Sequence, residues 1–369
     1  MVDIKSILAQ AIDREASDVH INVGMPPVLR KNTELILTDF DAISSENAKE
    51  MVLSMVGPDR FKKLEEKQDL DFSTTIEDGH RFRVNAHYQR DTIAISFRII
   101  PNQVPRIDDL HLPSIAKDLA ELPRGLVLVT GHTGSGKSTT LASMVGLINE
   151  KVSKRIITLE DPVEYALENN MCMIEQREIG EDCPDFASGL RHVLRQDPDI
   201  ILVGEMRDLE TTSSTITAAE TGHLVFSTLH TINAYQTIER IIDIYPSGQQ
   251  NQIRTMLANT LQAVISQTLF RRIDVPGMVP CTEILLCTSA VRNCVRENRI
   301  YEIPNIIETS RRMGMQTMDN SIADMYSQGH LDREEAVARS NNPGKMDKVL
   351  APMVGSASKE DEAKEFSIN

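Results

Sequence analysis

The first hundred residues mix helical and strand-like patterns of hydrophobic positions. Five apolar residues near the start lie three or four apart and predict a helix: Ile4, Ile7, Leu8, Ala11 and Ile12. Residues 17–21 predict a turn into a strand, which the sequence Gly-Met-Pro-Pro at 24–27 ends. Residues 82–88 and 92–99 alternate as two paired strands would. The mixture predicts a small α+β domain over residues 1–100.

Short runs of consecutive apolar residues dominate the next region. They occupy residues 126–130, 156–159, 200–203 and 224–227, and helical patterns usually follow them. Buried strands that alternate with helices are typical of a largely parallel sheet covered on both faces. We therefore expect an α/β domain over residues 114–340, joined to the first domain by a semi-rigid, proline-punctuated linker at residues 101–113.

Two further patterns lie toward the end of the chain. Seven apolar residues between 253 and 269 lie three or four apart and predict one long helix with an apolar stripe: Ile253, Met256, Leu257, Leu261, Val264, Ile265 and Leu269. Residues 341–369 are rich in Asn, Pro, Gly, Ser and charge, which predicts a disordered acidic tail.

Composition and charge narrow the class of protein. The chain has 369 residues and a formal net charge of −15, which argues against a sequence-independent nucleic-acid binder because such proteins need a basic surface. We expect neither a secretory signal nor a transmembrane segment. The five cysteines form no C-x-x-C pair, so buried or free thiols are expected rather than a disulfide framework or a zinc site.

One segment carries a specific chemical signal. It fits the pattern G-x-x-x-x-G-K-[ST], follows a predicted strand and opens a predicted helix: Gly131, His132, Thr133, Gly134, Ser135, Gly136, Lys137, Ser138 and Thr139. Glycines let backbone N–H groups wrap phosphates, and the helix N-terminus adds its positive dipole. Lys137 is expected to reach the β- and γ-phosphates of ATP, and the Ser138 hydroxyl to bind Mg²⁺.

Carboxylates follow two of the other apolar runs. Glu205 follows the run at 200–203, after Gly204. It is a candidate to hold Mg²⁺ or to polarise the attacking water. Glu160, Asp161 and Glu164 follow the run at 156–159, and one of them is a candidate base. A turn built on Asp161 and Pro162 is the alternative for this second group. Either Glu205 or Glu160 is eligible as the catalytic base.

Histidines and arginines complete the set of candidates. His223 and His230 bracket the run at 224–227, so they are either structural or sense the γ-phosphate. Arg81, Arg83 and Arg98 lie in the first domain, where one guanidinium could neutralise phosphoryl charge in a neighbouring subunit. Their spacing alone favours solvated or salt-bridged arginines.

Together these segments resemble the type IV pilus retraction ATPases, the PilT/PilU branch of the secretion-ATPase superfamily. The resemblance rests on the sequences GHTGSGKST (131–139), IITLEDPVEY (156–165), ILVGEMRD (201–208), ETGHLVFSTLHT (220–231) and AVRNCVRE (290–297), and covers about residues 17–339. Departures include His132 for a usual proline, Thr33 for a common glycine, and Val291 and Cys294 for larger apolar residues.

The resemblance implies a PAS-like N-terminal domain followed by a RecA-like P-loop ATPase domain, in a hexameric ring. It places Glu160 and Glu164 in an acidic box, Glu205 in the Walker B segment, and His223 and His230 in a histidine box. It implies ATP and Mg²⁺ as cofactors, and a cytoplasmic motor at the inner membrane that turns a pilus platform protein. A paralogous retraction ATPase is a further candidate partner.

Three alternatives remain open from the sequence. The chain could be an accessory retraction ATPase that depends on a main motor, or a nucleotide-gated assembly switch with little turnover. A RecA-like DNA-acting protein is the third, and the acidic balance counts against it.

Overall fold

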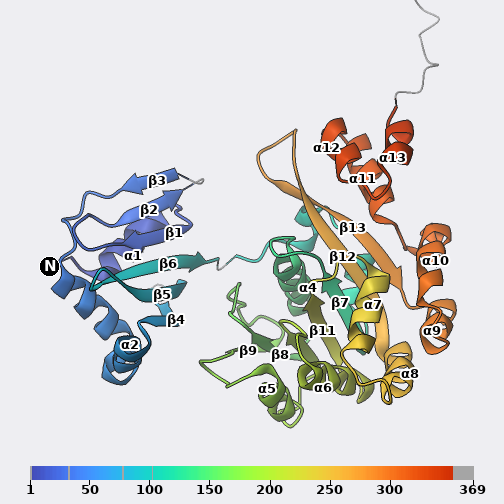
Figure 1. Ribbon diagram of the computed structural model, residues 1–369, viewed down its shortest axis with the longest axis horizontal. Helices are drawn as coiled ribbons and strands as arrows, with labels where there is room; N and C mark the ends of the chain where they lie inside the picture. Colours follow the sequence, from blue (N-terminus) through green and yellow to red (C-terminus); the bar gives the residue numbers. More distant parts are fainter. Residues whose placement is uncertain (1, 32–33, 77–78, 102, 352–369) are drawn as a thin grey trace, which may run out of the picture. The chain divides into compact units, whose positions relative to one another are not determined.

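Two β-sheets with flanking helices form the framework of the chain in the computed structural model, which describes residues 2–31, 34–76, 79–101 and 103–351 (Figure 1). The residues group into two units by their contacts. The first unit holds the residues up to Ile107 together with Ser138–Ser227, and the second holds Asp108–Lys137 together with the residues from Thr228 onward.

The smaller sheet lies in the first unit and has the strand order β3-β2-β1-β6-β5-β4, with antiparallel pairing throughout. Its strands are β1 (Asp18–Ile21), β2 (Val28–Lys31), β3 (Glu34–Leu37), β4 (Asp69–Thr75), β5 (Arg81–Gln89) and β6 (Thr92–Ile100). The paired strands expected at 82–88 and 92–99 are therefore confirmed as β5 and β6.

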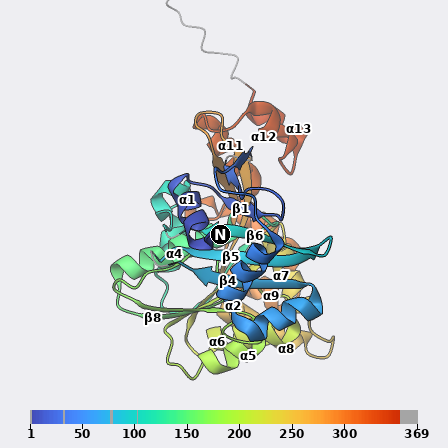
Figure 2. The same ribbon diagram turned by 90° about the vertical axis from the view of Figure 1, so that its left-hand side faces the viewer.

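Two helices accompany this sheet (Figures 1 and 2). They are α1 (Ile4–Asp13) and α2 (Ser45–Lys67), and α2 is interrupted where Gly57, at φ +72°, precedes Pro58. Ile7, Leu8 and Leu64 of these helices share one buried core with Phe82 and Phe97 of the sheet. The expected helix at residues 4–12 is confirmed, and this sheet with its helices has the α+β character that the sequence predicts.

The larger sheet has the order β13-β12-β7-β11-β10-β8-β9. Its strands are β7 (Gly125–Thr130), β8 (Arg155–Glu160), β9 (Met173–Glu178), β10 (Ile200–Val203), β11 (Leu224–Leu229), β12 (Leu261–Arg271) and β13 (Met278–Leu286). Strand β10 pairs in parallel with β8 and β11, β8 with β9, and β12 with β7, whereas β13 is antiparallel to β12. All residues of β7, β10 and β11 are buried, as expected for a covered parallel sheet.

Helices connect and flank these strands. They are α3 (Ile115–Ala120), α4 (Lys137–Lys151), α5 (Phe186–Val193), α6 (Leu209–Glu220), α7 (Ala234–Asp243), α8 (Gln250–Thr260), α9 (Ser289–Arg296), α10 (Ile303–Thr309), α11 (Met318–Ser327), α12 (Arg333–Ala338) and α13 (Pro343–Val349). Short 3-10 turns lie at Ile107–Leu110, Ile300–Glu302 and Arg311–Met313.

The long helix expected over residues 253–269 is wrong in its second half. Helix α8 ends at Thr260, and Leu261 begins β12, whose central residues are buried between β7 and β13. A strand buried on both faces reads as a nearly continuous apolar run, which spacing alone cannot separate from a buried helix. The β-branched Val264, Ile265 and Thr268 favour the strand.

The expectation of disorder beyond residue 340 is wrong for α13. Asn342 caps this helix by accepting a hydrogen bond from the Lys345 N–H, and Pro343 occupies its first turn. Met346 and Leu350, four residues apart, are buried in a cluster with Met318 and Ile322 of α11. Thr33 and residues 352–369, which include most of the predicted tail, lie outside the described residues.

The described residues can be compared with two further predictions, one about transmembrane segments and one about the cysteines. No described helix combines the length and the apolar character needed to cross a bilayer. The five cysteines are free thiols, four of them buried, and burial raises the pKa values of Cys281 and Cys287 to about 12.

Candidate functional site

The loop between β7 and α4 has a backbone that admits only glycine at its first position. Gly131 has φ +145°, and a Cβ atom there would lie 2.3 Å from the Gln267 carbonyl oxygen and 2.5 Å from Ser135 Oγ. A Cβ atom on Gly136, at φ +85°, would lie 2.7 Å from Gln267 Nε2. The loop is therefore drawn tightly against β12, and Gly131 and Gly136 are required by close approach as well as by positive φ.

Two side chains, Lys137 and Gln267, donate hydrogen bonds to carbonyl groups of this loop. Lys137 Nζ donates to the carbonyl oxygens of Gly131 at 3.0 Å and His132 at 3.1 Å. Gln267 Nε2 donates to the carbonyl oxygen of Ser135 at 2.8 Å, and Ser135 Oγ is buried without a hydrogen-bond partner. A lysine over the loop, an unsatisfied hydroxyl and the first turn of α4 are a donor set that fits a phosphate group.

Glu160 and Glu205 follow neighbouring strands at one edge of the sheet. Val203 pairs in register with Leu159, and the Gly204 N–H donates to the Leu159 carbonyl oxygen at 2.7 Å. A Cβ atom on Gly204 would lie 3.3 Å from the Glu160 Cα atom. The Glu205 carboxylate, with 12% of its side chain exposed, forms an ion pair with Arg207. The structure thus brings the two candidate carboxylates to the same edge, as the sequence predicts.

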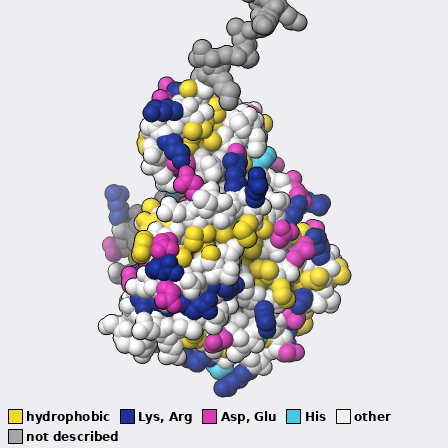
Figure 3. Space-filling view, turned by 90° about the vertical axis from the view of Figure 1, so that its right-hand side faces the viewer, with side chains coloured by type: hydrophobic (Ala, Val, Ile, Leu, Met, Phe, Trp, Pro, Cys, Tyr) yellow, Lys and Arg dark blue, Asp and Glu magenta, His cyan; other side chains and the backbone are white. Residues whose placement is uncertain are grey.

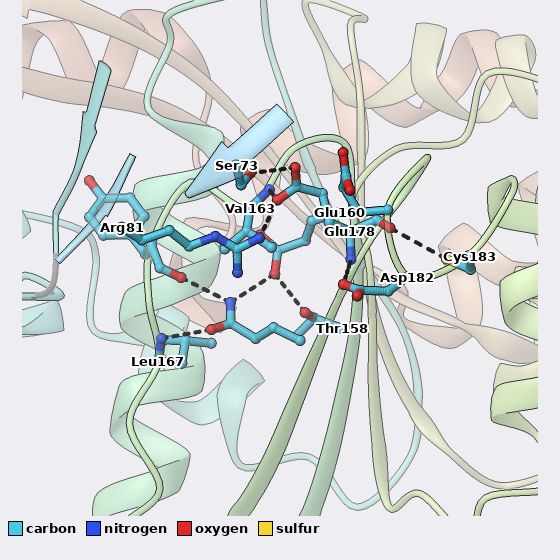
Figure 4. A network of polar contacts seen from close by, with 12 residues as sticks. Ser73, Arg81, Thr158, Glu160, Val163, Leu167, Glu178, Asp182 and Cys183 are labelled. Atoms are coloured by element: carbon cyan, nitrogen blue, oxygen red, sulfur yellow. Dashed lines mark hydrogen bonds and ion pairs between the residues drawn. The ribbon is translucent and has the colours of Figure 1, made fainter. Parts of the chain in front are cut away.

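Glu160 is held by two side-chain donors (Figure 4). Thr158 Oγ1 donates to its Oε1 atom at 2.6 Å, and Gln176 Nε2 donates to the same atom at 3.0 Å. Burial raises the pKa of Glu160, while these two hydrogen bonds act in the opposite direction. A carboxylate with a raised pKa is suited to accept a proton near neutral pH.

The segment after Glu160 carries the other acidic candidates. The chain bends at Asp161 and Pro162, whose peptide bond is cis, and both Asp161 and Glu164 are exposed. The backbone of Glu164 donates a hydrogen bond to Glu160. The Tyr165 hydroxyl lies 3.0 Å from Thr139 Oγ1 in the first turn of α4, so this segment touches the helix that follows the loop.

The two histidines lie at opposite ends of β11. His223 precedes the strand, and its Nδ1 atom lies 2.9 Å from the Ala218 carbonyl oxygen and 3.1 Å from Thr221 Oγ1. His230 follows the strand and is exposed. Glu205 also follows its strand, which runs parallel to β11. Because the two histidines lie at opposite ends of β11, they do not share one strand end, and a γ-phosphate sensor stays a prediction.

The three arginines lie on β5 and β6. Arg81 pairs with Glu178 of β9, and Arg98 pairs with Asp18 of β1. Arg83 is exposed and lines a pocket of about 510 Å³ together with Asp161. Two of the three are thus salt-bridged, which agrees with the interpretation that their spacing favours; a contact with a neighbouring subunit stays a prediction.

Several residues of this region escape sequence-based reasoning. Gln176 and Glu178 of β9 contact Glu160 and Arg81 respectively, and Gln267 of β12 supports the phosphate loop. The sequence gives no alternation that would single out the two β9 residues, because the last four residues of that strand, Glu175 to Glu178, are all polar.

The segment AVRNCVRE forms α9 in the second unit. Val291, Cys294 and Val295 are buried, so the apolar face of this helix points inward. Arg292 donates to the Ala258 carbonyl oxygen and, at 2.9 Å, to Gln262 Oε1, which anchors α9 to the end of α8 and the start of β12. On this side of the molecule, hydrophobic side chains gather in a band flanked by charged ones (Figure 3).

Among the residues that the structure describes, no group of three or more His, Cys, Asp or Glu side chains is arranged to hold a metal ion.

Comparisons with known proteins give consistent matches over most of the chain. A family model described as type II/IV secretion system protein matches residues 1–334. The type IV pilus retraction ATPase PilT of Pseudomonas aeruginosa is 41% identical over 342 residues, which cover 93% of this chain and 99% of that protein. A twitching motility protein of Neisseria gonorrhoeae is 44% identical over 320 residues, covering 87% of this chain and 86% of that protein.

One solved structure has a fold similar to that of this chain. The crystal structure of the pilus retraction motor PilT with bound ADP matches with a TM-score of 0.87 at 42% identity, covering 94% of this chain and 100% of that one. This match confirms the predicted fold class, in which a small α+β domain precedes a RecA-like P-loop domain.

Proposed function

The chain belongs to the type II/IV secretion system protein family, and from this membership we propose that it is an ATP-hydrolysing motor that drives retraction of type IV pili. The observation that carries the proposal is the identity to a pilus retraction ATPase over nearly the full length of both chains. The glycine-restricted loop between β7 and α4 supports it, because that loop offers the donors that a nucleotide phosphate needs.

The proposed mechanism begins with the phosphate loop. Lys137 is satisfied by two carbonyl oxygens of its own loop, and a phosphate group would compete for this ammonium group. Ser138 and Glu205 are the residues that we propose as Mg²⁺ ligands. When bound, Mg²⁺ would neutralise charge on the β- and γ-phosphates.

Glu160 is the group that we propose to orient the attacking water and accept its proton. Its carboxylate has a raised pKa because it is buried, and two donors fix one of its oxygens. Glu205 is already paired with Arg207, which suits a ligand role better than a base role. We further propose that His230, at the carboxyl end of β11, senses the γ-phosphate.

The working assembly that we propose is a homohexamer beneath the inner membrane. In this arrangement the ring engages a membrane-embedded platform protein on its cytoplasmic side, and hydrolysis around the ring removes pilin subunits from the base of the fibre. A guanidinium on β5 or β6 would complete the site of a neighbouring copy, with the exposed Arg83 as the candidate that the described ion pairs leave available.

Steady-state ATP hydrolysis by the purified chain tests the enzymatic part of this proposal. Wild type is compared with Lys137→Ala, Glu205→Ala and the control Lys151→Ala, which changes an exposed lysine in the last turn of α4. We expect Mg²⁺-dependent turnover in wild type and the control, and a loss of at least about 100-fold in the other two variants. A folded wild type that binds ATP without turnover would contradict the motor and favour a nucleotide-gated switch.

Cells test the assignment to pilus retraction. Deletion of the gene should abolish twitching and leave surface pili in excess, and wild type but not Lys137→Ala should restore motility. Normal twitching in the deletion strain, with every paralogous ATPase gene also removed, would overturn the assignment.

A further inference from the structure

Glu160 lies opposite a strand that has no part in the phosphate loop. Strand β9 pairs in parallel with β8, in a register that places Gln176 beside Thr158 and Glu178 beside Glu160. Because alternate residues of a strand share a face, Gln176 and Glu178 project to the same side as Thr158 and Glu160. Figure 4 shows Thr158, Glu160 and Glu178 in one network of polar contacts.

Gln176 uses both ends of its amide group in this network. Nε2 donates to Glu160 Oε1 at 3.0 Å and to the Tyr165 carbonyl oxygen at 2.9 Å, while Oε1 accepts from the Leu167 N–H at 2.8 Å. The three hydrogen bonds fix the orientation of the amide, because only its N–H₂ end can donate to the two oxygens. One glutamine therefore connects the candidate base to the backbone of residues 165–167.

The same segment contacts the helix of the phosphate loop. The Tyr165 hydroxyl lies 3.0 Å from Thr139 Oγ1, one residue after Ser138. Gln176 thus contacts the Glu160 carboxylate directly, and it reaches the first turn of α4 through Tyr165. This is the arrangement expected of a residue that fixes a catalytic carboxylate relative to the phosphate groups.

Few charged groups face Glu160. Glu164, in the segment after β8, adds a repulsion that raises the pKa of Glu160. On β9, the Glu178 carboxylate is bound by Arg81 Nη2 at 2.6 Å and Ser73 Oγ at 2.7 Å. On the β10 side, the backbone of Gly204 packs against Glu160, followed by the Glu205–Arg207 ion pair. The Thr158 and Gln176 donors therefore provide the main stabilisation of the ionised form.

We propose that Gln176 is a positioning residue for the hydrolytic reaction: its amide orients the Glu160 carboxylate and ties it, through Tyr165, to the first turn of α4. The inference rests on the proposed ATPase function. It adds a residue outside the phosphate loop, the acidic box, the Walker B segment and the histidine box. The effect that we propose for Gln176 is exerted through its hydrogen bond to Glu160.

The test compares Gln176→Leu and the isosteric Gln176→Glu with wild type. Glutamate keeps the shape and the acceptor for the Leu167 N–H but loses both donor bonds. The matched control is Glu175→Gln, the preceding residue on β9, whose carboxylate pairs with Arg155 at 2.7 Å on the opposite face. Circular dichroism and elution volume establish that each variant is folded and assembled.

The first readout is kcat and KM for MgATP between pH 5.5 and 9. Loss of the donor raises the pKa of Glu160, so we expect kcat in both Gln176 variants to fall more at the acid end of this range than at the alkaline end, by about tenfold where the effect is largest. KM should change less than about threefold, and Glu175→Gln should follow the wild-type profile. A kcat reduced by one factor at every pH, or left unchanged, would overturn the inference while the ATPase function stands.

The second readout needs no turnover, so it separates failure of this inference from failure of the proposed function. The free energy of unfolding in urea is measured from pH 5 to 8 for wild type and Gln176→Leu, each with and without Glu160→Gln. We expect the loss of stability in Gln176→Leu to grow as the pH rises, and this growth to vanish when residue 160 is glutamine. A loss that is independent of pH would overturn the inference whether or not the chain hydrolyses ATP.

Discussion

Arg81 and Glu178 form an ion pair between β5 and β9, with Nη2 of the arginine 2.6 Å from Oε2 of the glutamate. The Glu178 side chain is 7% exposed, and it also accepts a hydrogen bond from Ser73 Oγ of β4 at 2.7 Å. Within the first unit, one buried carboxylate thus joins two strands of the N-terminal sheet to the strand that supports the acidic segment (Figure 4).

Replacing Arg81 by methionine should destabilise the fold. The change keeps most of the apolar stem but leaves the buried Glu178 carboxylate without its counter-charge. We expect the free energy of unfolding in urea to fall by about 1–3 kcal/mol, below the range for fully buried pairs because Arg81 is 25% exposed.

A second ion pair provides the control for this prediction. Arg98 pairs with Asp18 at 2.9 Å, but its side chain is 70% exposed. Exposed pairs contribute little, so Arg98→Met should lower the free energy of unfolding by less than about 1 kcal/mol. If Arg81→Met and Arg98→Met lower the free energy of unfolding equally, burial of Glu178 does not determine how much stability is lost.

The order of elements was predictable wherever one local pattern is sufficient. The apolar runs at 126–130 and 200–203 correspond to β7 and β10, and the loop from Gly131 to Ser138 lies between a strand and a helix as expected. Each of these features depends on residues close together in sequence. The carboxyl ends of parallel strands then bring Glu160 and Glu205 to one edge.

The contacts that support the site were not predictable, because they join residues far apart in sequence. Gln267 lies 132 residues from Ser135, and its role was hidden by the expectation of a helix through that position. Gln176 acts through the β8–β9 register, which the sequence does not specify. His223 shows the converse case, since closeness to His230 in sequence did not place it at the same end of β11.

Gly131→Ala should disable the phosphate loop. A Cβ atom would lie 2.3 Å from the backbone oxygen of Gln267 and would stand at a φ of +145°, so the loop must shift. We expect the affinity for MgATP, measured by calorimetry, to fall by about 100-fold or more. Gly146→Ala, inside α4, is the matched control.

The control should itself stabilise the chain. A Cβ atom on Gly146 would make only an ordinary contact with Val104 Cγ1 at 3.7 Å. Alanine at this helical position should raise the free energy of unfolding by about 0.5–1 kcal/mol with the affinity for MgATP unchanged. Normal nucleotide affinity in Gly131→Ala would contradict the geometry assigned to the loop.

Gln267→Leu should weaken nucleotide binding without a change in the loop sequence. The substitution removes the hydrogen bond to the Ser135 carbonyl oxygen, and we expect the Kd for MgATP to rise about tenfold. Ser266→Ala is the control, since it breaks the buried contact with Thr130 Oγ1 at 2.9 Å and should lower stability by about 1 kcal/mol at unchanged affinity. A Kd raised equally in both variants would show a general effect of disturbing β12.

Glu160→Gln should abolish turnover and stabilise the fold at neutral and alkaline pH. Burial raises the pKa of Glu160 in the folded chain, so the folded state binds a proton more tightly than the unfolded state does. The stabilisation from this proton is complete below the unfolded pKa and is lost as the pH rises through the folded pKa. Glutamine cannot ionise and loses nothing.

The difference in unfolding free energy between Glu160→Gln and wild type should therefore shift in favour of the variant from pH 4 to pH 8. Urea titrations at several pH values measure it, and Glu220→Gln, which removes an exposed carboxylate at the end of α6, corrects for the loss of one negative charge. A difference that stays constant, or that turns against the variant at high pH, would mean that the carboxylate is not destabilised by burial. It would then lack the property that makes Glu160, rather than Glu205, the proposed base.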